Sequence, residues 1–447
     1  MVKHRCKQKE KRLKYFLLIV VILLVNIAAQ AQILSLEQCI DTALLYNRSI
    51  KLSRQDVNIS NEKNKEIKGN LIPKLNGIAD YRYYTDLPYQ LMPAAAFGGP
   101  EGTYKEVQFG VPQSLNASLQ LSVPLFNSTA LSAIKSTRIA MELSEIQKIK
   151  TDEDVIMEVT NAYYNAQILF TQITFLDSNI INTDKLVKTT TLLYQQEIAK
   201  ETDVDRLKLQ VEQITIQRST VISQYQQVLN ALKFLMGLPI SDSIVVLNIE
   251  KSIVRGSFQS KITSDVRLID KKIEFNNSEL HGLRNSKLPS LSAYGVYGTT
   301  GFGTTGSNSF FNFHPIGYVG AQLSLPLFNG RATQHKILGK KIEIEKSIIQ
   351  KELITEKSKL DLKNIEMQYI LAIRNISVVS SQTELAKKIY DNTVMLNLQA
   401  VANITDLLLA DNALRETQQN YLVALINLRR AELEYKKVTG NLISTKN

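Results

Sequence analysis

The amino-acid sequence predicts a mixed α and β fold with a two-fold internal repeat, in which long coiled-coil α-helical hairpins accompany four β-strands. The first observation is a heptad pattern of apolar residues over 204–235, which returns 203 residues later over 407–438. Heptads sustained for about four to five repeats are typical of helices packed along their length. The second observation is that each half contains two segments of alternating apolar and polar residues, as in half-exposed strands.

The chain begins with a predicted signal peptide, residues 1–31, which we expect to be cleaved. Basic residues precede a wholly apolar run, Phe16–Val25, and the small-residue site Ala29-Gln30-Ala31 follows, which is the pattern of a secretory signal. Seven basic residues against Glu10 in this segment supply +6 of the net charge of +11. Because no other basic block is interleaved with aromatic residues, no nucleic-acid partner is expected.

The residues that follow the signal do not suggest an enzyme. Cys39 is the one cysteine outside the predicted signal, and the four histidines are scattered singly. A catalytic thiol needs a base beside it, and a metal site needs several ligands together. The sequence therefore predicts no catalytic residues, no cofactor and no metal.

The first repeat is predicted to span residues 32–237. It should contain a helix over 36–68, two strands joined by a loop that is rich in Pro and Gly, and a helical hairpin. The strands are expected at 74–84 and 114–124, the loop at 86–112, the long helix at 128–195 and the return helix at 203–236. At 1.5 Å per residue the long helix would measure about 100 Å.

The second repeat, residues 265–447, follows a connector at 238–264 in which Ile244 to Leu247 has some strand character. It repeats the same order of elements. The helix is expected at 265–284, the strands at 288–298 and 318–326 with a loop over 298–315 between them, the long helix at 331–397 and the return helix at 405–438. The segment Leu325 to Asn329 also repeats Val123 to Asn127 as an apolar residue followed by Pro-Leu-Phe-Asn.

Strands of roughly ten residues with one apolar face can cross a bilayer when they are tilted, and long loops between them are typical of outer-membrane barrels. Four strands cannot close a barrel, and an open edge in lipid would leave backbone groups unpaired. Two chains would supply eight strands and three chains twelve. The long helices would extend far beyond the membrane, so heptads on all of them favour a closed tube in an aqueous compartment.

These features resemble the TolC-like outer-membrane factors, the outer membrane efflux protein family. The tips of the two helical hairpins resemble that family's pattern of Tyr, Gly, Asp, an apolar pair and Ala. The first tip offers Tyr194, Glu197 in place of Gly, Asp203 and Val204, and the second offers Asn397 in place of Tyr, Ala400 in place of Gly, Asp406, Leu407, Leu408 and Ala410. The resemblance implies a homotrimer with an intermolecular 12-stranded transmembrane β-barrel in outer-membrane lipid and a periplasmic tunnel of helices.

The resemblance also implies a function and a location. The chain would be the exit duct of a tripartite efflux pump in the outer membrane of a Gram-negative bacterium, docked on a periplasmic adaptor and indirectly on an inner-membrane transporter. The predicted docking residues are Tyr194, Glu197, Lys200, Asp203, Ala400, Asn403 and Asp406. Asp406 is also a candidate for an acidic ring at the periplasmic gate, the alternative being a simple helix cap.

Two other functions remain open from the sequence. A type I conduit for protein secretion would have the same architecture, and its genes would neighbour an ABC transporter rather than an antiporter. A coiled-coil scaffold without a pore is the third possibility, and the four alternating strands argue against it.

Overall fold

A computed structural model describes residues 32–247, 261–304, 312–399 and 401–442. The predicted signal peptide, residues 1–31, lies outside these residues. The chain divides into two compact units, the first made of the residues up to Gln55, Ile146–Leu268 and those from Glu352 onward, and the second of Asp56–Glu145 and Ile269–Lys351. Each unit thus takes segments from both predicted repeats.

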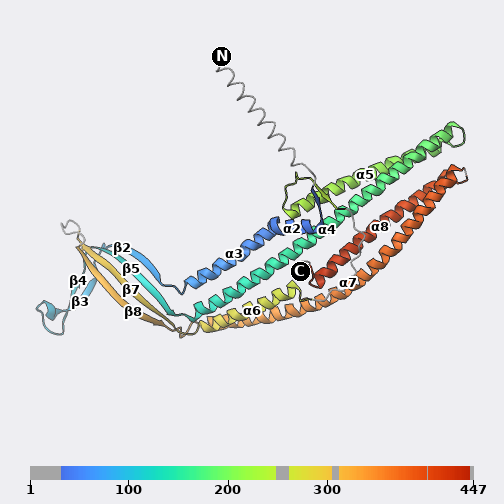
Figure 1. The fold of residues 1–447 in the computed structure, drawn as a ribbon. Helices are drawn as coiled ribbons and strands as arrows, with labels where there is room; N and C mark the ends of the chain where they lie inside the picture. The colour runs from blue at the N-terminus through green and yellow to red at the C-terminus, as the bar shows by residue number, and fades with distance from the viewer. Residues whose placement is uncertain (1–31, 248–260, 305–311, 400, 443–447) are drawn as a thin grey trace, which may run out of the picture. The chain divides into compact units, whose positions relative to one another are not determined.

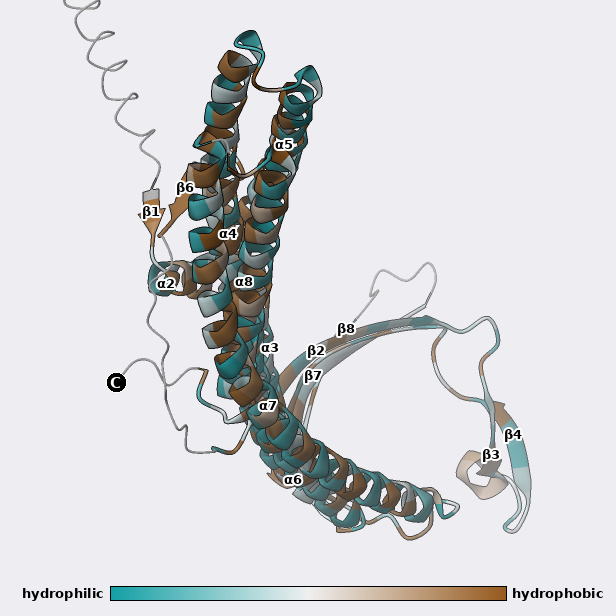
Figure 2. Cartoon of the chain, turned by 90° about the vertical axis from the view of Figure 1, so that its right-hand side faces the viewer, coloured by the Kyte–Doolittle hydropathy of each residue, from teal (hydrophilic) through white to brown (hydrophobic). Residues whose placement is uncertain are grey.

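Helices make up most of the described chain (Figure 1). They are α2 Leu36–Tyr46, α3 Arg48–Gly69, α4 Ser128–Gln195, α5 Glu201–Met236, α6 Ser264–Asn285, α7 Ala332–Leu398 and α8 Ile404–Val438. The four longest begin and end within two residues of the ranges expected from the heptad pattern. Apolar and polar residues are mixed along each of them (Figure 2), and among the described residues no helix has an apolar stretch that could span a bilayer.

The helix predicted over 36–68 is in fact two helices that meet at Asn47. The backbone of Asn47 is extended (φ −57°, ψ 134°), so α2 ends there. Its side-chain carbonyl accepts hydrogen bonds from Ser49 N (2.8 Å) and Ile50 N (3.2 Å), which caps the start of α3. Its amide donates to the carbonyl of Leu235 (2.6 Å). A contact with distant α5 thus sets this break, which the local pattern did not reveal.

The second unit contains one antiparallel sheet of four strands in the order β2, β5, β7, β8. The strands are β2 Lys74–Tyr83, β5 Gln113–Phe126, β7 Ser290–Gly303 and β8 Asn312–Ser324. Within the described chain, β2 and β8 each pair with one strand, so each has an unpaired edge. The four predicted strands therefore form one sheet that is open at both sides.

The two faces of this sheet differ in charge. Residues directly opposite one another share a face, and the register pairs Leu75 with Leu121 and Leu119 with Tyr297. All of the ionisable Lys, Arg, Asp and His side chains of the four strands lie on the other face; they are Lys74, Asp80, Arg82 and His314. One face of the sheet is therefore uncharged from edge to edge.

Three of the four strands, β5, β7 and β8, are longer than the sequence predicted. β5 continues to Phe126, because an irregularity between Pro124 and Phe126 accommodates the proline that we expected to end it. β7 and β8 occupy much of the predicted loop over 298–315, of which residues 305–311 lie outside the described part. Paired strands can include Gly and an edge proline that in isolation indicate a loop.

The predicted loop at 86–112 is partly ordered. It contains a hairpin of β3 Tyr89–Pro93 and β4 Tyr104–Gln108, joined by the 3-10 turn Ala94–Phe97. Gly98, with φ +78°, ends that turn in the left-handed conformation. The predicted loop therefore contains a hairpin that its Pro and Gly content did not indicate.

A short parallel pair of strands lies in the first unit. Strand β1, Gln32–Leu34, pairs with β6, Ile244–Val246, in the segment where the connector showed strand character. The hydroxyl of Tyr163 on α4 donates to the carbonyl of Leu34 (3.1 Å). This pair and α2 share a buried apolar cluster with α4 and α5, which includes Cys39.

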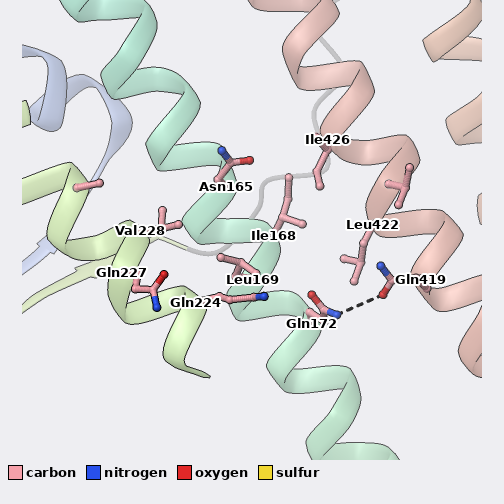
Figure 3. A pocket seen from close by; sticks show the side chains of 12 residues that line it. Asn165, Ile168, Leu169, Gln172, Gln224, Gln227, Val228, Gln419, Leu422 and Ile426 are labelled. Carbon is pink, nitrogen blue, oxygen red and sulfur yellow. Dashed lines mark hydrogen bonds between the residues drawn. The ribbon is translucent and has the colours of Figure 1, made fainter. Parts of the chain in front are cut away.

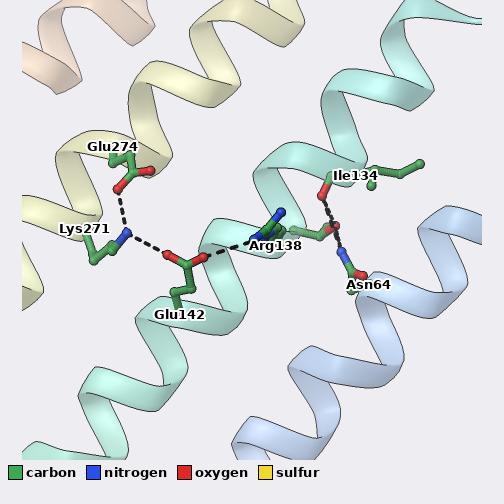
Figure 4. A network of polar contacts seen from close by, with 7 residues as sticks. Asn64, Ile134, Arg138, Glu142, Lys271 and Glu274 are labelled. Carbon is green, nitrogen blue, oxygen red and sulfur yellow. Dashed lines mark hydrogen bonds and ion pairs between the residues drawn. The ribbon is translucent and has the colours of Figure 1, made fainter.

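Polar contacts join the helices of the second unit (Figure 4). Asn64 on α3 donates to Thr137 Oγ1 on α4 (2.8 Å). Lys271 on α6 lies 2.6 Å from Glu142 Oε2 on α4. Glu142 is also 3.8 Å from Arg138 Nε. Because these ion pairs are partly exposed, each adds less than about 1 kcal/mol of stability, and they mainly fix how the helices pair.

Candidate functional site

The tip of the first hairpin is a tight helix ending at the end of α4. Ile198 N donates to the carbonyl of Leu193 (2.9 Å) and Glu197 N to that of Tyr194 (2.9 Å). This is the Schellman pattern, which requires a left-handed residue at Glu197. Glu197 has φ +61°, a conformation that favours glycine. Glu197, which stands where the family pattern has Gly, thus takes a backbone conformation that glycine adopts more readily.

The other predicted residues of this tip surround the same turn. Tyr194 is 42% exposed, and Glu197 and Lys200 are exposed as well. Asp203, the third residue of α5, is partly buried, and its carboxylate accepts a hydrogen bond from Lys200 N (3.4 Å). The first tip therefore presents an aromatic ring and charges of both signs.

At the second tip, Val401 N and Ala402 N donate to the carbonyl of Leu396 (2.9 and 3.2 Å), as Ile198 N and Ala199 N donate to that of Leu193 at the first tip. Asn397, which replaces the family's Tyr, donates from its side chain to the carbonyl of Ala402 (2.9 Å). Ala400 lies outside the described residues, so its predicted docking role stays a prediction.

Asp406 lies three residues into the start of the second return helix. Asn403 is the helix cap, and its side chain accepts a hydrogen bond from Asp406 N (2.9 Å). The Asp406 carboxylate accepts one in turn from Asn403 N (3.2 Å), which completes a capping box. Asp406 itself is exposed. Its carboxylate therefore has a local structural role and is also open to solvent.

An apolar cluster from all four long helices lies next to the tips. Its buried members are Leu186, Leu207, Ala386, Tyr390, Ile404, Leu407, Ala410 and Leu414. Both seams predicted from the heptads contribute to it, through Leu207 on α5 and Leu407 on α8. The two hairpins are thereby held together near the tips.

The sequence did not reveal the buried carboxylate of Asp411. Only 6% of this residue is exposed, and its Oδ2 accepts a hydrogen bond from Gln210 Nε2 on α5 (2.9 Å). Arg415 Nε lies 3.1 Å away. Burial raises the pKa of Asp411, while Arg415 and Gln210 oppose this effect. Burial, followed by the charge of Asp411, raises the pKa of Tyr390 to about 12.

A groove of about 420 Å³ lies between the two hairpins, lined by α4, α5 and α8 (Figure 3). Its floor is apolar and includes Ile168 and Leu422, which are buried. Amide side chains surround this floor, and Gln172 Nε2 donates to Gln419 Oε1 across it (3.2 Å). The two hairpins thus meet here through an apolar floor that amide side chains border.

The described residues offer little for catalysis. They hold no group of three or more His, Cys, Asp and Glu side chains that could bind a metal. Burial raises the pKa of the Cys39 thiol to about 12, so it is not a nucleophile at neutral pH.

Residues 39–238 match the model of the outer membrane efflux protein family. The chain is 20% identical to the outer membrane protein TolC of Salmonella enteritidis over 425 residues, which cover 89% of this chain and 81% of TolC. Solved structures share the fold. VceC of Vibrio cholerae aligns with a TM-score of 0.71 at 13% identity over 91% of this chain and 96% of its own. The channel MtrE of Neisseria gonorrhoeae aligns with a TM-score of 0.72 at 17% identity, over 91% of this chain and 89% of its own.

The matches bear on several predictions made from the sequence. The mixed fold with long helical hairpins is confirmed, while the barrel remains a prediction. An efflux channel located in the outer membrane is confirmed at the level of the family, which is one of channels and not of enzymes. Residues 39–238 are thus similar to the outer membrane efflux protein family, and most of the chain is similar to TolC.

Proposed function

We propose that three copies of this chain form the outer-membrane exit duct of a tripartite efflux pump, through which substrates pass passively. The four-stranded sheet carries this proposal. One of its faces is uncharged from β2 to β8, as a surface in contact with lipid must be, and both of its edges are unpaired in the part of the chain that the structure describes. Twelve strands from three copies would close the barrel and remove those edges.

A second apolar seam on α7 supports an assembly of copies. Seven apolar residues at steps of four and seven are 43–60% exposed. They are Leu360, Met367, Leu371, Val378, Leu385, Ile389 and Leu396. The seam that α7 buries within the chain is a different one, which includes Ile365 and Ile376. Exposed heptads on a helix in water are typical of a face that another helix covers.

The tips are the proposed docking surface for a periplasmic adaptor, and through it for an inner-membrane transporter. The exposed side chains of Tyr194, Glu197, Lys200, Asn403 and Asp406, together with Asp203, support this role. Ala400 belongs to the same proposal.

Purified protein in planar bilayers tests the proposed duct. We expect discrete single-channel currents, and a detergent-corrected mass of three chains. A protein that is monomeric and does not conduct would contradict the proposal.

A further inference from the structure

The internal repeat defines how neighbouring copies would join, an inference that rests on the trimeric barrel proposed above. The hairpin β2–β5 and the hairpin β7–β8 have the same register. Leu75 faces Leu121 in the first, and the equivalent residues Leu291 and Leu323 face each other in the second. Strand β7 thus corresponds to β2, and β8 corresponds to β5.

The chain also shows how one hairpin joins the next. Strand β5 of the first hairpin pairs with β7 of the second, and Leu121 faces Gly295, Leu119 faces Tyr297 and Ala117 faces Thr299. In a closed barrel, β8 is left to pair with β2 of the next copy, which is the same kind of junction between equivalent strands.

We propose that β8 joins β2 of the next copy in the register of the β5–β7 junction. Leu323 then faces Ala79 of the next copy, Ala321 faces Tyr81 and Val319 faces Tyr83. Every one of these residues belongs to the uncharged face of its strand. In two of these pairs a small side chain faces a large one, since Ala79 faces Leu323 and Ala321 faces Tyr81.

The exposed fractions of equivalent residues agree with a missing neighbour beside β8. Leu121 is 42% exposed, and its equivalent Leu323 is 69% exposed. Leu121 lies between β2 and β7, whereas within the described chain Leu323 has β7 on one side and no strand on the other.

Other registers can be compared with this one. A shift by one residue would turn the charged face of β2, with Lys74, Asp80 and Arg82, toward lipid, which is unfavourable. A shift by two residues keeps the faces correct and pairs Ala321 with Ala79 or with Tyr83. The experiment must therefore distinguish the proposed register from registers shifted by two residues.

Disulfide cross-linking between pairs of cysteines introduced into the full-length protein can distinguish these registers. Directly opposite Cα atoms are about 4.5–5.5 Å apart, within the range of a disulfide, whereas residues two positions away are too distant. With a mild oxidant, Ala321→Cys with Tyr81→Cys should give covalent trimers on a denaturing gel, and so should Val319→Cys with Tyr83→Cys. Ala321→Cys with Ala79→Cys, and Ala321→Cys with Tyr83→Cys, are the shifted controls.

The outcomes separate the register from the proposed function. Disulfides in a shifted pair would overturn the register and leave the trimeric duct intact. If no pair cross-links in a protein whose native mass is three chains, β8 and β2 do not meet and the junction is wrong. A monomeric mass would overturn the duct itself. The unsubstituted protein should give no cross-links, since Cys39 is fully buried.

Discussion

At the scale of single residues, Glu197 has the least favourable backbone at the first tip. A left-handed conformation costs a residue with a side chain about 1–2 kcal/mol of steric energy. Glycine avoids this cost, but it loses more conformational entropy on folding, which costs about 0.5–1 kcal/mol. We expect Glu197→Gly to stabilise the tip by up to about 1 kcal/mol, measured by hydrogen exchange of its amides. Gln226→Gly, at an exposed site within α5, should instead cost about 1 kcal/mol. Equal losses in both variants would contradict this account.

Asp411 leads to a prediction about pH. Because its pKa in the folded protein is raised from the ordinary 3.8, its contribution to stability is present below that ordinary pKa and is lost as the pH rises through the raised value. Asp411→Asn has no such titration and can still bond Gln210. As the pH rises from the ordinary pKa through the raised one, the stability of this variant should therefore increase relative to that of the original protein. Thermal unfolding of both proteins over this pH range measures the difference. A constant difference would show that Asp411 is not desolvated.

At the scale of helices and strands, the sequence predicted what depends on periodicity. The heptads located α4 and α7 within a few residues, because each helix is long and free of proline. The break at Asn47 depends on a bond to Leu235 in another helix, and the extension of β7 to Gly303 depends on its pairing with β5 and β8. Neither partner can be identified from the local sequence.

The two faces of β5 give a prediction at this scale. Leu119→Arg or Leu121→Arg should cost about 2–4 kcal/mol if those residues meet lipid at mid-depth. Gln120→Arg is the matched control, because its side chain lies on the face that carries Asp80 and Arg82. Unfolding from lipid bilayers measures the difference. Equal losses on both faces would show that the faces are wrongly assigned.

At the scale of the whole molecule, the family resemblance predicted which residues lie at the tips but not the state of Asp411. An acidic residue beside a heptad seam is usually solvated, and its burial here depends on how α5 lies against α8. Likewise, the pattern at the first tip lacked its glycine, yet Glu197 takes a left-handed conformation there. Residue identity was therefore a weaker guide than the position in the turn.

The tips should matter for transport and not for assembly. Glu197→Lys, Lys200→Glu or a bulky residue at position 400 should abolish export while the trimer stays in the outer membrane, because these residues are proposed to contact an adaptor. Glu212→Lys, an exposed charge reversal further along α5, should have no effect. Export assays and the amount of trimer in isolated membranes distinguish the two roles. Loss of the trimer would mark the tip residues as structural.

The gate is the last consequence of the proposed trimer. Three Asp406 carboxylates around a narrow axis would attract multivalent cations and favour cation over anion passage. Asp406 also accepts a hydrogen bond from Asn403 N, and Asn in its place can accept the same bond without the charge. Asp406→Asn should therefore reduce cation selectivity and block by multivalent cations in single-channel recordings.

A control exists in the same chain. Asp203 holds the equivalent third position of α5 and accepts from Lys200 N, so Asp203→Asn changes the same kind of cap at the other tip. If Asp406 alone forms the ring, Asp203→Asn should leave selectivity unchanged. If Asp406→Asn leaves both selectivity and block as they were, the carboxylates do not converge on the axis, and Asp406 serves the helix alone.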